Sequence, residues 1–154
     1  MYLFFKTIHI LGAALLIGNA IITAFWKIYA DRTRGPAIVA FAQRLVTVTD
    51  WVFTGSGIFL LVVGGYGMLW VSGVDPFSLG WLFWGQAAFY FSGVIWILFL
   101  VPTQIAQARQ ARSFADGAPV PTSYLRLGHR WLAWGAVSTL PLILAFYMMV
   151  AKPA

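Results

Sequence analysis

The chain of 154 residues is 61% hydrophobic and 18% aromatic, and only 9% of its residues are charged. A soluble domain carries about 25% charged residues and leaves about a third of its surface in water at this size, so the composition excludes a soluble globular protein. The absence of cysteine excludes disulfides, iron–sulfur clusters and thiolate zinc sites. The net charge of +6 comes from basic residues between apolar runs, which indicates contact with anionic lipid headgroups rather than nucleic acid.

Four apolar runs are long enough to cross a bilayer, which takes about 20 residues of helix. Backbone groups in lipid must be satisfied within their own segment, and none of the runs alternates as barrel strands do, so each run predicts a helix. The predicted helices cover about 3–30, 45–70, 81–112 and 130–150. The expected fold is therefore all-α, with residues 1–154 forming a single transmembrane domain, an integral membrane four-helix bundle.

Basic residues gather in the connection between the first two helices and in the connection between the last two. They are Lys27, Arg32, Arg34 and Arg44, followed by Arg109, Arg112, Arg126 and Arg130. The positive-inside rule places both connections in the cytoplasm and both termini outside. We therefore expect a multi-pass protein of the bacterial inner (cytoplasmic) membrane, with its termini in the periplasm and the lipid bilayer as its main partner.

Small and polar residues follow helical spacing in the first two runs, and such residues favour close helix packing in lipid. The first stripe contains His9, Gly12 or Ala13, Leu16, Asn19 or Ala20, and Thr23. The second stripe contains Asp50, Thr54, Gly57, Leu61, Gly64 and Met68. We expect these two stripes to face each other across the bundle.

An ionisable residue inside a span is costly and normally marks function, which singles out His9. Three interpretations stay open: an axial ligand to haem b, a ligand to copper, or a neutral histidine hydrogen-bonded to a neighbouring helix. The other histidine, His129, is expected at the opposite side of the membrane. A span of about 20 residues is about 30 Å long, so His9 and His129 of one chain are not ligands of the same haem.

A second axial ligand would have to lie at the depth of His9. Met68 is the first choice because it lies on the inward stripe, and glycines on either side would let a flat macrocycle approach the backbone. Lys6, one turn before His9, would pair with a propionate or a lipid phosphate. The other candidates at this depth are Tyr66, Gln86, Met148 and Met149.

Asp50 is the one acid predicted inside a span. Burying an unpaired carboxylate is expensive, so a partner is expected. The candidates at similar depth are His129, Arg130 and Arg44, which predicts a structural ion pair. A proton relay through Asp50 is the sharper alternative.

Several stretches resemble a bacterial family of predicted integral membrane proteins catalogued as domain of unknown function twenty-two sixty-nine. They are KTIHILGAALLIGN, AFWKIYADRTRGPAIVAFAQRLVTVTDWVFTGSG, GGYGM and WILFLVPTQIAQARQAR. The resemblance covers most of the chain, up to about residue 112. More distantly, the KxxHI start and the four-helix layout are similar to HemJ-type protoporphyrinogen oxidases and CopD-type copper-resistance proteins. The HemJ-type resemblance implies haem b at His9, although Gly85 stands where those proteins tend to have a functional lysine.

We predict a protein that binds haem b near the outer leaflet through His9 and acts in electron transfer or in porphyrin or quinone redox chemistry. If it is an enzyme, it is a haem-dependent membrane oxidoreductase. The other axial ligand would come from Met68 or from His9 of a second chain in a homodimer. One alternative is a copper-handling or small-solute transport protein with His9 and Met68 as metal ligands. Another is a non-catalytic accessory subunit of a larger membrane complex.

Overall fold

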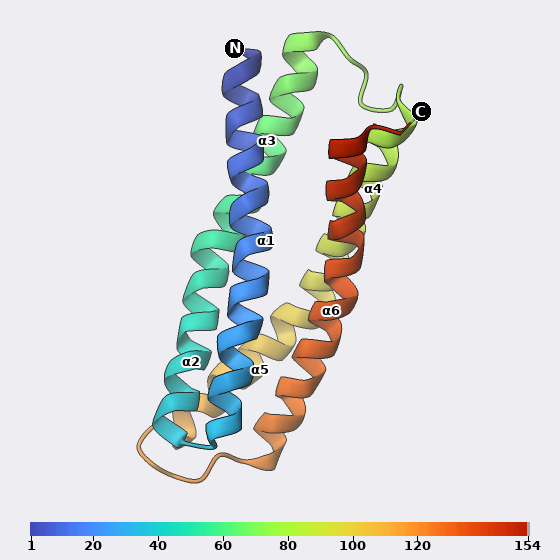
Figure 1. Cartoon of the computed structure of the whole chain (residues 1–154). Helices are drawn as coiled ribbons and strands as arrows, with labels where there is room; N and C mark the ends of the chain where they lie inside the picture. Colours follow the sequence, from blue (N-terminus) through green and yellow to red (C-terminus); the bar gives the residue numbers. More distant parts are fainter. Residues whose placement is uncertain (154) are drawn as a thin grey trace.

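The computed structural model describes residues 1–153, and these residues form long helices joined by short connections (Figure 1). Four helical segments within this range are long and apolar enough to cross a membrane, which confirms the predicted all-α membrane bundle. The first is α1 (Tyr2–Thr33) and the last is α6 (Thr122–Ala151). The second runs through α2 (Pro36–Thr49), η1 (Asp50–Thr54) and α3 (Gly55–Ser72). The third runs through α4 (Gly80–Ile95), η2 (Trp96–Leu100) and α5 (Val101–Phe114).

Two helices begin earlier than the apolar runs predict. The second starts at Pro36 rather than near 45, and the last starts at Thr122 rather than near 130. Proline suits the first position of a helix, because its missing N–H has no partner there in any case. Hydropathy marks only the part of a helix that lies in hydrocarbon, whereas intrahelical hydrogen bonds continue wherever the backbone permits. The polar early turns are therefore helical although they are not apolar.

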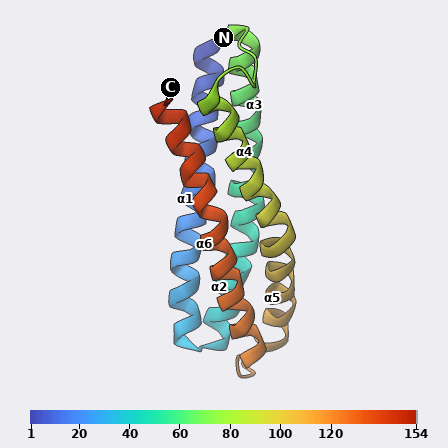
Figure 2. The same cartoon turned by 90° about the vertical axis from the view of Figure 1, so that its right-hand side faces the viewer.

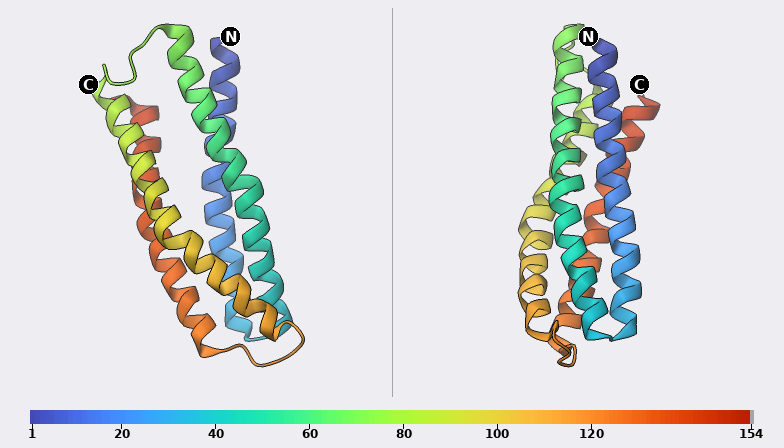
Figure 3. Two further views of the ribbon diagram at one scale, coloured as in Figure 1. Left: turned by 180° about the vertical axis from the view of Figure 1, so that it is seen from behind. Right: turned by 90° about the vertical axis from the view of Figure 1, so that its left-hand side faces the viewer.

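The helices form two pairs, α1 with α3 and α4 with α6 (Figures 1 and 2). The pairs diverge toward the end of the molecule where both chain termini lie, which we call the termini end. At the opposite end, called the basic end, α5 lies across α2 and contacts it (Figure 3, left). The backbone of α3 does not come close to that of α4 or α6, so the helix pairs are packed together at the basic end and stand apart at the termini end.

The two hydrophobic clusters of buried residues both include residues of α2 and α6. Val39 of α2 packs with Phe114 and Tyr124, and Val46 of α2 packs with Leu100 and Trp131. Many large apolar side chains outside these clusters are exposed, as expected of helices whose surroundings are lipid. The clusters hold the two pairs together away from the termini end.

Glycines bring the backbones of α1 and α3 close together. A Cβ atom added to Gly64 would lie 2.6 Å from the backbone nitrogen of His9, and one added to Gly12 would lie 2.7 Å from the carbonyl oxygen of Gly57. No larger residue fits at such positions without a shift of the backbone, which is how small residues favour helix association in lipid. The two predicted stripes do face each other, and this expectation is confirmed.

Two π-helical turns interrupt the second and third spans. They are η1, which begins at Asp50, and η2, which ends at Leu100. A π turn inserts an extra residue, shifts the faces of the helix that follows and is frequent at functional sites. Here the two turns lie on opposite sides of one pocket, described below.

Candidate functional sites

His9 is partly buried at the α1–α3 contact, and its ring makes one hydrogen bond within residues 1–153. Its Nδ1 lies 2.7 Å from the carbonyl oxygen of Leu61. A carbonyl only accepts, so Nδ1 carries the proton and Nε2 of the neutral ring keeps its lone pair. The ring rests on Gly65, whose added Cβ would lie 3.2 Å from Nδ1. His9 is thus held in one tautomer, with Nε2 as the ring nitrogen left for a ligand.

The glycines around Met68 serve helix packing rather than an open surface. An added Cβ at Gly64 would meet the His9 backbone, and one at Gly67 would meet the ring of Phe5. The space above these glycines is therefore filled by α1. Met68 itself is partly buried one turn beyond Gly64, and Lys6 is exposed one turn before His9.

Tyr66 and Gln86 are brought together by the fold and hydrogen-bond each other. The Tyr66 hydroxyl lies 2.9 Å from Gln86 Oε1 and 2.9 Å from the hydroxyl of Tyr90. Because Gln86 Nε2 donates to the carbonyl of Pro76, Gln86 Oε1 accepts from Tyr66, and Tyr90 in turn donates to Tyr66. This chain of hydrogen bonds links α3 to α4 near the termini end, and it occupies two of the side chains considered as second axial ligands.

Met148 and Met149 are not assembled with His9. Both pack beside Gly85 of α4, where an added Cβ would lie 2.8 Å from Cε of Met149. They belong to the α4–α6 pair, whose backbones are not close to that of α3 at this end. The soft-metal set that combines His9, Met68 and these two methionines is therefore not brought together within one chain.

Asp50 begins η1 and is 8% exposed. Its Oδ1 accepts from Asn19 Nδ2 at 2.8 Å and from the Thr54 hydroxyl at 3.3 Å. Asn19 Nδ2 also donates to Thr54 Oγ1 at 3.0 Å. The three side chains come from the two facing stripes, so the same periodicity that packs α1 against the second span assembles this polar cluster.

The ion pair expected for Asp50 is not formed. His129 and Arg130 are exposed on α6, and Arg44 is exposed on α2. Within the described residues 1–153, the one ion pair joins Lys27 to Asp31. The neutral amide of Asn19 takes the place that a cation was expected to hold.

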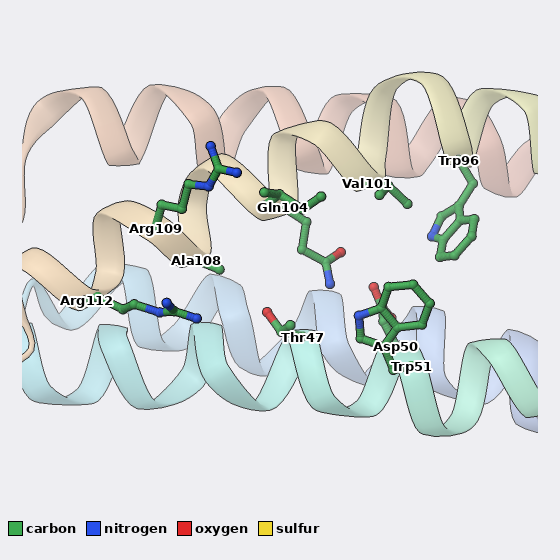
Figure 4. Close-up of a pocket in the computed structure, with 10 residues that line it drawn as sticks. Thr47, Asp50, Trp51, Trp96, Val101, Gln104, Ala108, Arg109 and Arg112 are labelled. Carbon is green, nitrogen blue, oxygen red and sulfur yellow. The ribbon is translucent and has the colours of Figure 1, made fainter.

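A pocket of about 220 Å³ opens beside Asp50, between α2 and η1 on one side and η2 and α5 on the other (Figure 4). Gln104 is 6% exposed and extends from α5 toward Asp50, and its Oε1 is buried without a hydrogen-bond partner. Arg109 and Arg112 line the pocket further along α5. The remaining lining residues are Thr47, Trp51, Trp96, Val101, Ile105 and Ala108.

Lys27 forms a buried polar centre near the basic end that the sequence reading missed. It is fully buried, and its Nζ lies 3.0 Å from Asp31 Oδ2 and 3.0 Å from the Tyr124 hydroxyl. The Tyr124 hydroxyl donates to Gln43 Oε1 at 3.1 Å. With its amide oxygen turned inward, Gln107 accepts from Nζ at 3.2 Å. Continuing the first stripe by four residues from Thr23 reaches Lys27, and this was the signal that could have found it.

No group of three histidine, cysteine, aspartate or glutamate side chains that could hold a metal ion occurs in the part of the chain that the structure describes. A closed metal site of the usual protein ligands is therefore not assembled in residues 1–153.

The chain belongs to a family of predicted integral membrane proteins, DUF2269, whose family model matches residues 3–153. The match covers nearly the whole chain and agrees with the four apolar helices. No curated protein and no solved structure matches the chain.

Proposed function

We propose that this member of the DUF2269 family binds haem b through His9 and acts in membrane electron transfer. One observation carries the proposal: the hydrogen bond from His9 Nδ1 to the carbonyl of Leu61, which leaves Nε2 as the free ring nitrogen. Histidines that bind metals almost always donate their other N–H to a carbonyl or carboxylate, because this fixes the tautomer and the orientation of the ring. His9 has that second partner already in place.

The donor set favours haem over copper. A porphyrin supplies the equatorial nitrogens itself and asks the protein for one or two axial ligands. A copper site built from protein alone needs several soft ligands together, and Met148 and Met149 lie in the other helix pair. When bound, haem b supplies reversible one-electron chemistry.

The second axial ligand is proposed to come from Met68 or from His9 of a second chain. Tyr66 and Gln86 are less suited, because their polar atoms are engaged with each other. Lys6 is exposed on the same helix as His9, where its ammonium group would pair with a haem propionate. In the orientation that the basic residues favour, with both termini in the periplasm of a bacterial inner membrane, the haem would lie near the outer leaflet.

A visible spectrum tests the proposal. The protein is expressed with an ample haem supply, purified in detergent and measured oxidised and reduced. We expect a Soret band and a reduced-minus-oxidised difference in the wild type, and loss of both in His9→Ala. His129→Ala is the matched control, because this exposed imidazole at the other end of the bundle should leave the spectrum unchanged.

The second ligand is identified in the same preparation. Loss of low-spin character in Met68→Leu would assign Met68, whereas an unchanged spectrum in a dimeric preparation with half a haem per chain would assign the His9 of a second chain. A wild-type protein that stays colourless after haem is added, although it elutes as a single folded species, would refute haem binding.

A further inference from the structure

Asp50 is a buried carboxyl group that no cationic side chain pairs with within residues 1–153. Its hydrogen-bond donors, the amide of Asn19 and the hydroxyl of Thr54, are both neutral. The one ion pair in this part of the chain belongs to Lys27 and Asp31. An ionised carboxylate taken out of water needs a compensating charge as well as hydrogen bonds. The site therefore calls for one positive charge that the protein itself does not supply.

Two buried amide oxygens beside Asp50 are also without partners. Oδ1 of Asn19 belongs to the amide that donates to Asp50, and Oε1 of Gln104 belongs to the side chain that extends toward Asp50 from α5 (Figure 4). Both side chains are at least nine-tenths buried. Together with the carboxylate and the Thr54 hydroxyl, they are hard oxygen atoms from three spans, the type of ligand that hard cations bind. Asn19 presents its Nδ2 to the carboxylate, so its amide would turn to bring Oδ1 to a bound metal cation. A single carboxylate matches a single positive charge.

The pocket of about 220 Å³ connects this cluster with the surface. Asp50 and Gln104 lie at one end of its lining, and the exposed side chains of Arg109 and Arg112 lie about one and two turns further along α5. Water and a small ion can therefore reach Asp50 from the basic end. The positive charge of the two arginines opposes the arrival of a cation, so it should make the site release its ion more readily.

We propose that Asp50, with the amide oxygens of Asn19 and Gln104, binds one monovalent cation, a proton or Na⁺, and exchanges it through this pocket. The charged groups that face the pocket are Asp50 itself and the two arginines of α5. The site is independent of His9 and does not depend on haem binding. It makes the second span a cation-exchanging element rather than a purely structural one.

Labelling with dicyclohexylcarbodiimide tests the site, because this reagent modifies protonated carboxyl groups in apolar surroundings. The full chain in lipid nanodiscs is labelled over a range of pH and the adducts are located by mass spectrometry. We expect modification at Asp50 that falls as the pH rises and is abolished in Asp50→Asn. Asp75 and Asp116 are exposed and serve as internal controls that stay unmodified.

Two further comparisons separate the proton from Na⁺. If Na⁺ is the ion, NaCl should suppress labelling several-fold relative to choline chloride, and Asn19→Leu or Gln104→Leu should weaken that protection. If the ion is the proton, the two salts should give equal labelling. In choline chloride, the double variant Arg109→Gln/Arg112→Gln should hold the proton more tightly, which shifts the pH dependence of labelling upward. If Na⁺ is the ion, the same variant should need less NaCl for protection.

Tryptophan fluorescence provides a second measurement that does not depend on access of dicyclohexylcarbodiimide to the pocket. Trp51 and Trp96 line the pocket, so emission should change with pH or with NaCl in the wild type and not in Asp50→Asn. The proposal would be overturned if neither the labelling of Asp50 nor the tryptophan emission changed with pH or with Na⁺. The visible spectrum of His9→Ala reports on haem alone, so failure of one proposal is distinguishable from failure of the other.

Discussion

The Nζ atom of Lys27 lies 3.0 Å from the hydroxyl of Tyr124, although 97 positions separate the two residues in the chain. Both side chains are fully buried, and the lysine is also over the tyrosine ring, 4.8 Å from its centroid. The contact joins α1 to α6 near the basic end, where the two helix pairs meet. The hydrogen bonds around this buried charge involve side chains from four helices, so all four must be in place for the cluster to form. The cluster therefore favours one arrangement of the bundle.

Replacing Lys27 by methionine keeps the side-chain volume and removes the charge. Asp31 then loses its cationic partner, and breaking one side of a buried pair costs about 3–5 kcal/mol of unfolding free energy. We expect the thermal unfolding midpoint in detergent, followed by circular dichroism, to fall clearly. Lys6→Met is the matched control, because Lys6 is exposed on the same helix and its loss should leave the midpoint unchanged. Equal midpoints for the two variants would show that the Lys27 cluster does not hold the bundle together.

Gly64→Ala tests the close approach of α1 and α3. The added methyl group would lie 2.6 Å from backbone atoms of His9 and Phe5, which cannot move as a side-chain tip can. Overpacking of this kind costs about 1–3 kcal/mol, so the unfolding midpoint should drop. Gly18→Ala on α1 meets nothing within 4 Å and should be neutral or slightly stabilising. If both variants behave alike, the helix separation in solution is larger than the structure has it.

Tyr66→Phe removes the hydrogen bonds that link α3 to α4 near the termini end. One hydrogen bond contributes about 1 kcal/mol, so we expect little change in global stability and a wider separation of the two helix pairs at this end. The chain has no cysteine, so spin labels at Trp70→Cys and Trp84→Cys report the α3–α4 distance without background labelling. The distance distribution should broaden in Tyr66→Phe and stay as in the wild type in Tyr147→Phe, which alters an exposed tyrosine of α6. A haem spectrum that is unchanged in Tyr66→Phe would agree with His9 as the ligand.

Ser92 and Ser138 tie α4 to α6 through reciprocal contacts. Their hydroxyl oxygens lie 3.0 Å apart, and Ser92 Oγ donates to the carbonyl of Ser138 at 2.8 Å. Polar contacts between helices in lipid are worth about 0.6 kcal/mol on average, so a double-mutant cycle with alanine should give a coupling energy of that order. The free energy of unfolding is measured in mixed micelles for the wild type, the two single alanine variants and the double variant. A coupling energy of zero would mean that the serines act only as small residues that let the helices approach.

Periodicity was sufficient to predict the main contact of the molecule. Residues at steps of three and four from His9 and from Asp50 share one face of their helices, and the structure places those faces together at Gly12, Gly57 and Leu61. Spacing along a helix fixes the direction of each side chain, so this much follows without coordinates. The count of the membrane helices likewise follows from hydrophobicity and length.

The partners of the polar residues were decided by the tertiary structure. Charge alone suggested that Asp50 pairs with a basic residue, whereas the fold gives it the amide of Asn19. Charge alone also grouped Lys27 with the basic residues of the first connection, whereas the fold buries it against Tyr124. Which polar atoms meet depends on the relative depth and rotation of separate helices. The π turns η1 and η2 change the rotation of the helices that follow them, and neither turn can be recognised from composition or periodicity.

The sequence by itself determined that the chain forms four apolar helices and which faces of the first two helices pack together. It also determined that the imidazole of His9 lies within a membrane span, where an ionisable side chain is energetically costly. Only the tertiary structure decided the protonated nitrogen of that imidazole, through the carbonyl of Leu61, and the pocket that opens beside Asp50. The physical reason is that hydrophobicity and helical spacing act along one segment. A hydrogen bond or a pocket between segments exists only once their separation, depth and rotation are fixed together.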